Sequence, residues 1–162
     1  MAVPCEALVL GIGNLLWADE GFGVRAVEAL HAAFAFPAAV TLKDGGTLGL
    51  NLYEDVASAR RVLVLDAVDF GLTPGSLVVL RGDDVPAWGR TKLSPHQLGF
   101  NDVLALAQLN GRAPDVVGER GIAEAAFVID ARFVERVGDA HEVAAMGWHA
   151  AAEVAGEVER GG

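Results

Sequence analysis

Cysteine is almost missing from this chain, because Cys5 is the single thiol among 162 residues. One cysteine excludes a disulfide bond within the chain and a metal site built from several thiolates. The same scarcity is typical of proteins that work in a reducing compartment. No base stands beside Cys5 in the sequence, so we expect no cysteine nucleophile.

Basic residues are also scarce, with 12 Lys and Arg against 22 Asp and Glu and a formal net charge of -10. The basic groups at Arg60-Arg61 and Arg90-Thr91-Lys92 are short and isolated. A partner with a phosphate backbone requires a basic stripe that releases counterions, and this sequence has none. We therefore expect no nucleic-acid partner.

Long apolar runs are missing too, although 52% of the residues are hydrophobic. No run approaches the roughly 20 residues that span a bilayer, and the first residues lack the basic start and cleavage site of a signal peptide. The sequence therefore predicts a cytoplasmic protein without membrane insertion. Its length and apolar fraction suit a single domain over residues 1–162.

Short apolar runs alternate with amphipathic segments along the chain. Strands are expected at residues 7–10, 40–42, 62–65 and 76–80, and helices from residue 21, over 48–56 and from residue 95. Such alternation predicts parallel pairing through right-handed crossovers. The expected fold is therefore α/β, a three-layer α/β/α sandwich with a twisted, mostly parallel sheet. The unbroken apolar run at 62–65 predicts a central strand.

A helix start is predicted at Ser94-Pro95-His96-Gln97. Ser94 fits an N-cap, Pro95 the first helical position, and Gln97 the return partner of a capping box. His96 then lies in the first helical turn, where side chains meet ligands rather than core. A single histidine in that place is more often surface decoration, so its role depends on its neighbours.

Two carboxylates are expected close to this histidine. In open α/β sheets, ligands bind beyond the carboxyl ends of the strands. Glu20 follows the first strand at the start of a helix, Asp66 ends the strongest strand, and His96 opens a later helix. Singly, each has a structural explanation, as a helix-dipole partner, a turn cap or surface decoration. Together, two carboxylates and an imidazole form a ligand set that suits nickel, zinc, iron or manganese.

The glycine loop Gly11-Ile12-Gly13 invites comparison with dinucleotide-binding loops. That fingerprint requires a third small residue three positions on, where this chain has Leu16. The bulky segment Asn14-Leu15-Leu16-Trp17 also hinders close approach of a pyrophosphate. Dinucleotide binding is therefore not expected, and a small-molecule α/β enzyme that uses this loop stays an alternative.

Several short motifs follow one another between residues 8 and 117: Gly11-Ile12-Gly13-Asn14, Asp19-Glu20-Gly21-Phe22-Gly23-Val24-Arg25, Asp44-Gly45-Gly46-Thr47, Asp66-Ala67, Pro74-Gly75 and Ser94-Pro95-His96-Gln97. In this order, they resemble the motifs of the hydrogenase maturation endopeptidases. The resemblance implies a twisted sheet between helix layers. It also implies a protease that trims the C-terminal extension of a nickel–iron hydrogenase large-subunit precursor after nickel insertion.

The metal-binding residues carried over by this resemblance are Glu20, Asp66 and His96. Two schemes stay open: a metal held by these residues activates water, or they recognise nickel already seated in the precursor. The resemblance favours the second scheme, in which the precursor supplies the nickel. Asp44 is then a candidate for activating water or supporting the site. A nickel-binding chaperone or sensor that does not cleave is the alternative function.

The resemblance weakens after residue 117, where Gly118-Glu119-Arg120-Gly121-Ile122 lacks an expected proline. Divergence under selection predicts a buried strand at residues 127–129 with a helix at 144–154 packed across it. A change of reading frame predicts loose packing and an exposed edge strand. The missing turn signal after the apolar run favours the second explanation slightly.

Overall fold

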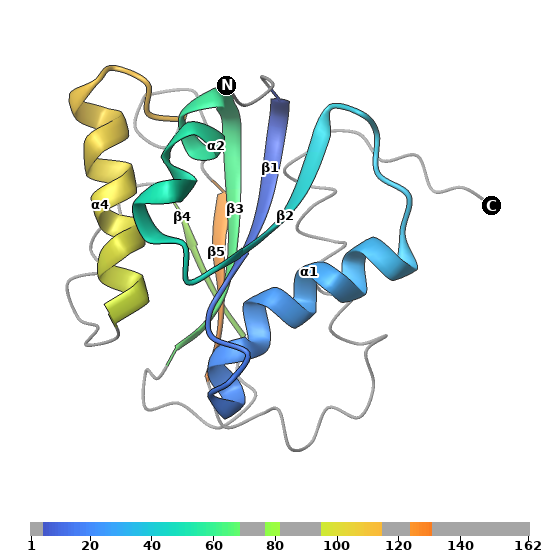
Figure 1. Cartoon of the computed structure of the whole chain (residues 1–162). Coiled ribbons are helices and arrows are strands. Elements are labelled where there is room, and N and C mark those ends of the chain that lie inside the picture. Colours follow the sequence, from blue (N-terminus) through green and yellow to red (C-terminus); the bar gives the residue numbers. More distant parts are fainter. Residues whose placement is uncertain (1–4, 69–76, 82–94, 115–123, 131–162) are drawn as a thin grey trace.

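The computed structural model describes residues 5–68, 77–81, 95–114 and 124–130. Its strands form one five-stranded sheet in the order β2-β1-β3-β5-β4 (Figure 1). Four strands are parallel, whereas β4 runs antiparallel to β5. The mostly parallel sheet predicted from the sequence is therefore confirmed. The strands are β1 (Cys5–Ile12), β2 (Val40–Gly46), β3 (Ala59–Val68), β4 (Leu77–Arg81) and β5 (Glu124–Asp130).

Helices cover both faces of this sheet, which confirms the predicted three layers. Helix α1 (Phe22–Ala33) packs on one face, and α2 (Tyr53–Ser58) and α4 (Pro95–Leu109) pack on the other. Two short 3-10 helices, η1 (Ala18–Gly21) and η2 (Gly49–Leu52), precede α1 and α2. Figure 1 shows α1 separated from α2 and α4 by the strands.

Alternation along the two central strands divides the core in two. The core beneath α1 contains Ala7, Val9, Leu63 and Leu65, and the core beneath α2 and α4 contains Leu8, Leu10, Ile12, Val62 and Val64. Odd positions of β1 and β3 therefore face α1, and even positions face α4. Because both faces are covered, the apolar run at 62–65 is central, as predicted.

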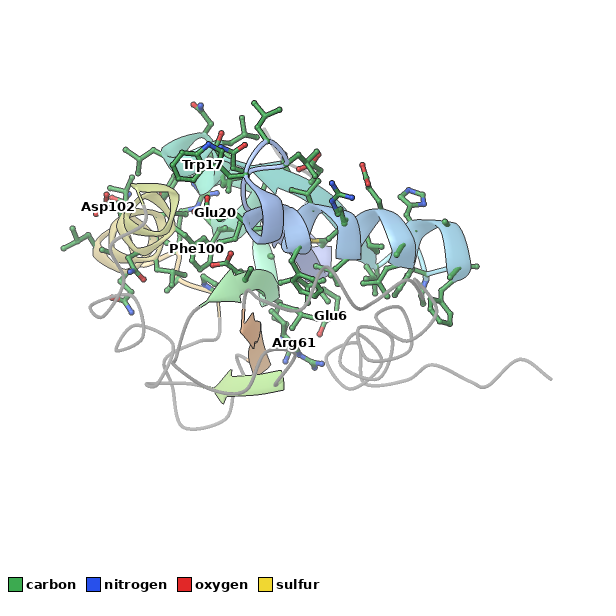
Figure 2. All side chains as sticks on the ribbon, turned by 90° about the horizontal axis from the view of Figure 1, so that it is seen from below. Glu6, Trp17, Glu20, Arg61, Phe100 and Asp102 are labelled. Carbon is green, nitrogen blue, oxygen red and sulfur yellow. The ribbon has the colours of Figure 1, made fainter. Side chains whose placement is uncertain are left out.

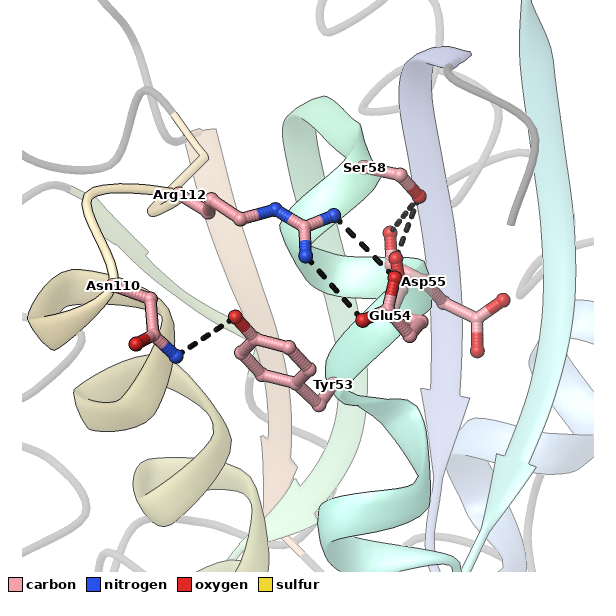
Figure 3. Close-up of polar contacts among 6 residues, drawn as sticks. All are labelled: Tyr53, Glu54, Asp55, Ser58, Asn110 and Arg112. Carbon is pink, nitrogen blue, oxygen red and sulfur yellow. Dashed lines mark hydrogen bonds and ion pairs between the residues drawn. The ribbon is translucent and has the colours of Figure 1, made fainter. Parts of the chain in front are cut away.

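Helix α4 is fixed to the layer below it near both ends. Near its start, a Cβ atom added to Gly99 would lie 3.0 Å from the Cα atom of Gly49, so the helix lies directly on η2. At its far end, Arg112 donates hydrogen bonds of 3.3 and 3.4 Å to Glu54, and Asn110 donates one of 3.0 Å to the Tyr53 hydroxyl (Figure 3). These contacts define where α4 begins relative to the sheet.

Close backbone packing at glycines brings the start of α1 onto the strand ends. A Cβ atom at Gly23 would overlap the carbonyl oxygens of Ile12 and Leu65. Gly13 has a φ of 136°, and a Cβ atom there would overlap the carbonyl oxygen of Glu20. The glycines of this loop thus serve helix–strand packing, which explains their spacing without a dinucleotide.

Several elements differ in extent from the predicted ones, among them β2, β3 and the helix expected at residues 48–56. Strand β2 continues through Asp44-Gly45-Gly46, which the sequence predicts as a turn, because Asp44 still pairs with Gly11 of β1. The missing side chain of Gly45 also leaves room for Leu10 and Ile12. Strand β3 continues beyond Asp66 to Val68, and the helix expected at 48–56 is divided into η2 and α2.

The later part of the chain contributes β5, which confirms the strand predicted near residues 126–129. Strand β5 pairs with β3 on one side and β4 on the other, so the expectation of an exposed edge strand is wrong. The helix predicted at 144–154 lies outside the described residues. Within the described ranges, no helix combines the length and apolar character that crossing a membrane requires.

Candidate functional site

Glu20 lies at the edge of the sheet where β1 and β3 end. The chain leaves β1 at Ile12 and folds back through η1, which contacts β3. The N–H of Asn14 donates to the carbonyl of Glu20 at 3.0 Å, and the N–H of Glu20 donates to the carbonyl of Trp17 at 2.8 Å. Main-chain hydrogen bonds therefore hold the half-buried Glu20 at this edge, which Figure 2 shows from below.

Asp66 is a buried carboxylate on β3, with only 2% of its surface exposed. It follows Val62 and Val64 at alternate positions, so it lies on the face that α4 covers. Its Oδ1 atom accepts a hydrogen bond of 2.8 Å from the N–H of Ala67. Aspartate is rarely buried so completely unless the site requires its charge or its hydrogen bonds.

His96 occupies the first turn of α4, as predicted, and the details of its side chain lie outside the described part of the chain. Position 96 precedes Gly99 and Phe100 by three and four residues, so the three positions share one helix face. Gly99 lies against η2, and Phe100 is 2% exposed in the core beneath α4. That face therefore packs toward the side of the sheet that carries Asp66.

The three predicted ligand positions thus share one region of the molecule. Helix α4 starts at the end of the sheet where β1 and β3 finish (Figure 1). Among the described side chains, which exclude that of His96, no group of three His, Cys, Asp or Glu residues is placed to hold a metal ion. Convergence of Glu20, Asp66 and His96 on one ion stays a prediction. Their two carboxylates and imidazole fit nickel by donor type.

Asp44 lies on the other face of the sheet. It alternates with Val40 and Leu42, which pack against the core beneath α1. Its Oδ1 atom accepts a hydrogen bond of 2.9 Å from the N–H of Gly46. Asp44 also lines a groove of about 440 Å³ together with Glu28 and His31 of α1. The structure therefore gives Asp44 a local hydrogen bond at the end of β2, and its role in catalysis stays a prediction.

Cys5 lies at the start of β1, at the opposite edge from Glu20. Burial raises the pKa of its thiol, an effect that a hydrogen bond with Thr41 partly offsets. A raised pKa leaves less thiolate at neutral pH, and thiolate is the reactive form. Position and ionisation both agree with the expectation that Cys5 is not a nucleophile.

Sequence reasoning treated residues 14–17 only as an obstacle to dinucleotides. In the structure, this loop exposes Leu16 and Trp17 by 88% and 69% at the same edge as Glu20. The sequence signal for this exposed surface was the run of three large apolar residues, Leu15-Leu16-Trp17, between a strand and a helix. Loops are usually polar, so an apolar loop beside candidate ligands indicates a contact surface.

Comparison with known proteins gives one consistent result. The family model for hydrogenase maturation proteases matches residues 24–128. The hydrogenase expression/formation protein HupD of Rhodobacter capsulatus is 59% identical over 112 residues, which cover 68% of this chain and 53% of that protein. The hydrogenase 2 maturation protease of Escherichia coli (strain K12) is 44% identical over 108 residues, 66% of either chain.

Solved structures agree with these relatives. The hydrogenase maturating endopeptidase HybD from E. coli aligns with a TM-score of 0.77 and 32% identity, covering 91% of this chain and 93% of that one. The solution structure of an endopeptidase from Escherichia coli aligns with a TM-score of 0.74 and 33% identity over the same shares. The chain spans about half the length of the first curated relatives it matches, 53% and 55% for two of them.

Proposed function

Because this chain belongs to the hydrogenase maturation protease family, we propose that it is an endopeptidase acting on a nickel–iron hydrogenase large-subunit precursor. In this proposal it removes the C-terminal extension of the precursor after nickel has been inserted. Glu20, Asp66 and His96 recognise that nickel, which belongs to the substrate. The observation that supports this role is the placement of Glu20 and the buried Asp66 at the edge where α4 begins.

The chemistry of these residues suits recognition of a cation. Burying a carboxylate such as Asp66 is unfavourable unless a positive charge or hydrogen bonds compensate it. A nickel ion in the precursor supplies positive charge, and bound metal ions also polarise carbonyl groups. A precursor without nickel lacks this attraction to the carboxylates of Glu20 and Asp66, so its binding is weaker. The site thereby couples cleavage to completed metal insertion.

The test compares nickel-loaded and nickel-free precursor, each incubated with the full chain, by the intact mass of the large subunit. We expect the loaded precursor to lose its extension and the nickel-free precursor to keep its mass. Equal processing of both forms would contradict nickel recognition. Stable binding of the loaded precursor with no change in mass would instead indicate the non-cleaving chaperone or sensor.

A matched pair of variants connects this activity with the site. Glu20→Gln removes a charge at the sheet edge, and Glu28→Gln removes a charge from the exposed surface of α1. We expect Glu20→Gln to slow processing of the loaded precursor and Glu28→Gln to leave it unchanged. Equal rates for both variants would exclude Glu20 from the site.

A further inference from the structure

Two neighbouring loops at the edge of the sheet that carries Glu20 expose large apolar side chains. The first loop, after β1, exposes Leu15, Leu16 and Trp17 by 44%, 88% and 69%. The second loop, which runs from β2 into η2, exposes Leu48 and Leu50 by 47% and 55%. A hydrogen bond of 3.0 Å from the N–H of Gly13 to the carbonyl of Gly46 joins the two loops. We call these five side chains the apolar rim.

The rim is exposed although its loop is well ordered by hydrogen bonds. The side chain of Asn14 accepts a hydrogen bond from the N–H of Leu16 at 3.0 Å, and its carbonyl accepts one from the N–H of Trp17 at 3.1 Å. The carbonyl of Trp17 accepts from the N–H of Glu20 at 2.8 Å. A surface fixed in this way loses little conformational entropy when a partner covers it.

The rim is continuous with the candidate site. Residues 14–20 form one hydrogen-bonded loop that carries Leu16, Trp17 and Glu20. Figure 2 shows Trp17 and Glu20 on the same side of the molecule. A free metal ion or a small metabolite reaches Glu20 without covering Leu16 and Trp17. A polypeptide that presents a metal to Glu20 also extends over the residues beside it, which include Leu16 and Trp17. The exposed apolar surface therefore fits a macromolecular substrate.

We infer that the apolar rim docks an apolar segment of the substrate protein beside the bond that is cleaved, an inference that rests on the proposed function. Leu16 and Trp17 are then positioning residues that set affinity for the precursor. Contacts of this kind involve side chains only, because the hydrogen bonds of the loop use the main chain and Asn14. Substitution at positions 16 and 17 therefore leaves the loop conformation in place.

The decisive variant is the double substitution Leu16→Ser with Trp17→Ser in the full chain. Its matched control is Leu109→Ser, which removes an equally exposed leucine, 84% exposed, at the far end of α4. With nickel-loaded precursor, we expect the double variant to raise KM at least about fivefold over the control, with kcat unchanged. The melting temperature of both variants stays that of the wild type. A smaller rise in KM, or a loss confined to kcat, overturns the inference.

Direct binding of the precursor to the immobilised chain separates this inference from the proposed function. Wild-type binding that weakens in the double variant supports the rim even where no cleavage occurs, and the absence of cleavage then overturns the protease function alone. Cleavage with equal binding by all variants overturns the rim alone. Absence of both binding and cleavage by the wild type overturns both. A wild-type dimer that the double variant abolishes assigns the rim to a second copy of the chain and also overturns the inference.

Discussion

Asp66 places a charge directly after the aliphatic run at residues 62–65 of β3. Val62 and Val64 precede it on the same face of β3, and all three are buried. A third valine would fill this position without the unfavourable desolvation of a carboxylate. Part of that cost is offset by the hydrogen bond from the N–H of Ala67, and the proposed recognition of nickel would offset more. Its register partner on β5 is Val128.

Asp66→Asn tests the charge with little change in shape. The asparagine Oδ1 atom still accepts from the N–H of Ala67, so we expect the fold to be retained by circular dichroism. Processing of the loaded precursor falls by more than about 100-fold, since even the outer partners of metal ligands change affinity by about 10–100-fold. Wild-type rates of processing in this variant would remove Asp66 from the proposed site.

His96→Ala is expected to abolish processing while the chain stays folded. The packing of the first half of α4 rests on Gly99 and Phe100, which lie one turn later on the same face. Thermal unfolding reports the fold, and the mass of the large subunit reports processing. A variant that unfolds normally and still cleaves would exclude His96 from the site.

Cys5→Ser is expected to leave cleavage unchanged. Burial raises the pKa of the Cys5 thiol, so little thiolate forms at neutral pH, and the residue lies at the edge of the sheet opposite Glu20. The measurement is the processing rate at neutral and at alkaline pH. A normally folded variant without activity would overturn the account centred on Glu20, Asp66 and His96.

At the scale of elements, the strength of each sequence signal decides how much could be predicted. The run at 62–65 predicts a central strand because four consecutive apolar residues require cover on both faces. The end of β2 was missed because Gly45 and Gly46 are typical of turns, whereas here Gly45 makes room for Leu10 and Ile12. Periodicity also carries no direction, so the antiparallel pairing of β4 could not be read from it.

The candidate site was likewise predictable only in part. The positions of Glu20 and Asp66 follow from the ends of two parallel strands, which meet at one edge of any such sheet. The face on which Asp44 lies depends on the register of β2, and the exposure of Leu16 depends on what packs above the loop. Neither the face of Asp44 nor the exposure of Leu16 can be predicted from the local spacing of residues.

Gly23→Ala tests whether the packing of α1 positions Glu20. The added Cβ atom overlaps the carbonyl oxygens of Ile12 and Leu65, so α1 and η1 must move away from the strand ends. We expect a loss of stability of about 1–3 kcal/mol and a fall in processing. The measurements are chemical denaturation and the processing rate.

Gly111→Ala is the control for that prediction. Position 111 has a φ of 63° and open space around it, so the substitution costs about 1–2 kcal/mol through backbone conformation alone. Because Gly111 follows the far end of α4, we expect stability to fall and processing to persist. A similar loss of processing in both variants would show that activity follows stability and not the position of η1.

At the scale of the whole molecule, the candidate residues Glu20 and Asp66 lie at one edge of the sheet, and backbone packing and hydrogen bonds hold the surrounding helices in place. The start of α1 is held by packing on Ile12 and Leu65, and α4 is held near its start by η2 and at its end by Glu54 and Tyr53. Parallel strands bring the loops after β1 and β2 to the same edge. The fold therefore brings Asp66 and the second half of the apolar rim, Leu48 and Leu50, to the loop that carries Glu20, although these residues are far apart in the sequence.

The last prediction concerns the stability of β5 against local opening, because β5 pairs with the strand that carries Asp66. Phe127, Val128 and Ile129 pair with β3 on one side and β4 on the other, so their amides lie inside the sheet. We expect hydrogen exchange at these amides to be as slow as at Leu63 in the central strand, because opening them requires global unfolding. The turn at Gly111, whose amide makes a single hydrogen bond at the end of α4, serves as the reference for exchange through local opening. Exchange at residues 127–129 as fast as at that turn would indicate a loosely packed tail, as a change of reading frame predicts, and would leave Asp66 beside an unsupported strand.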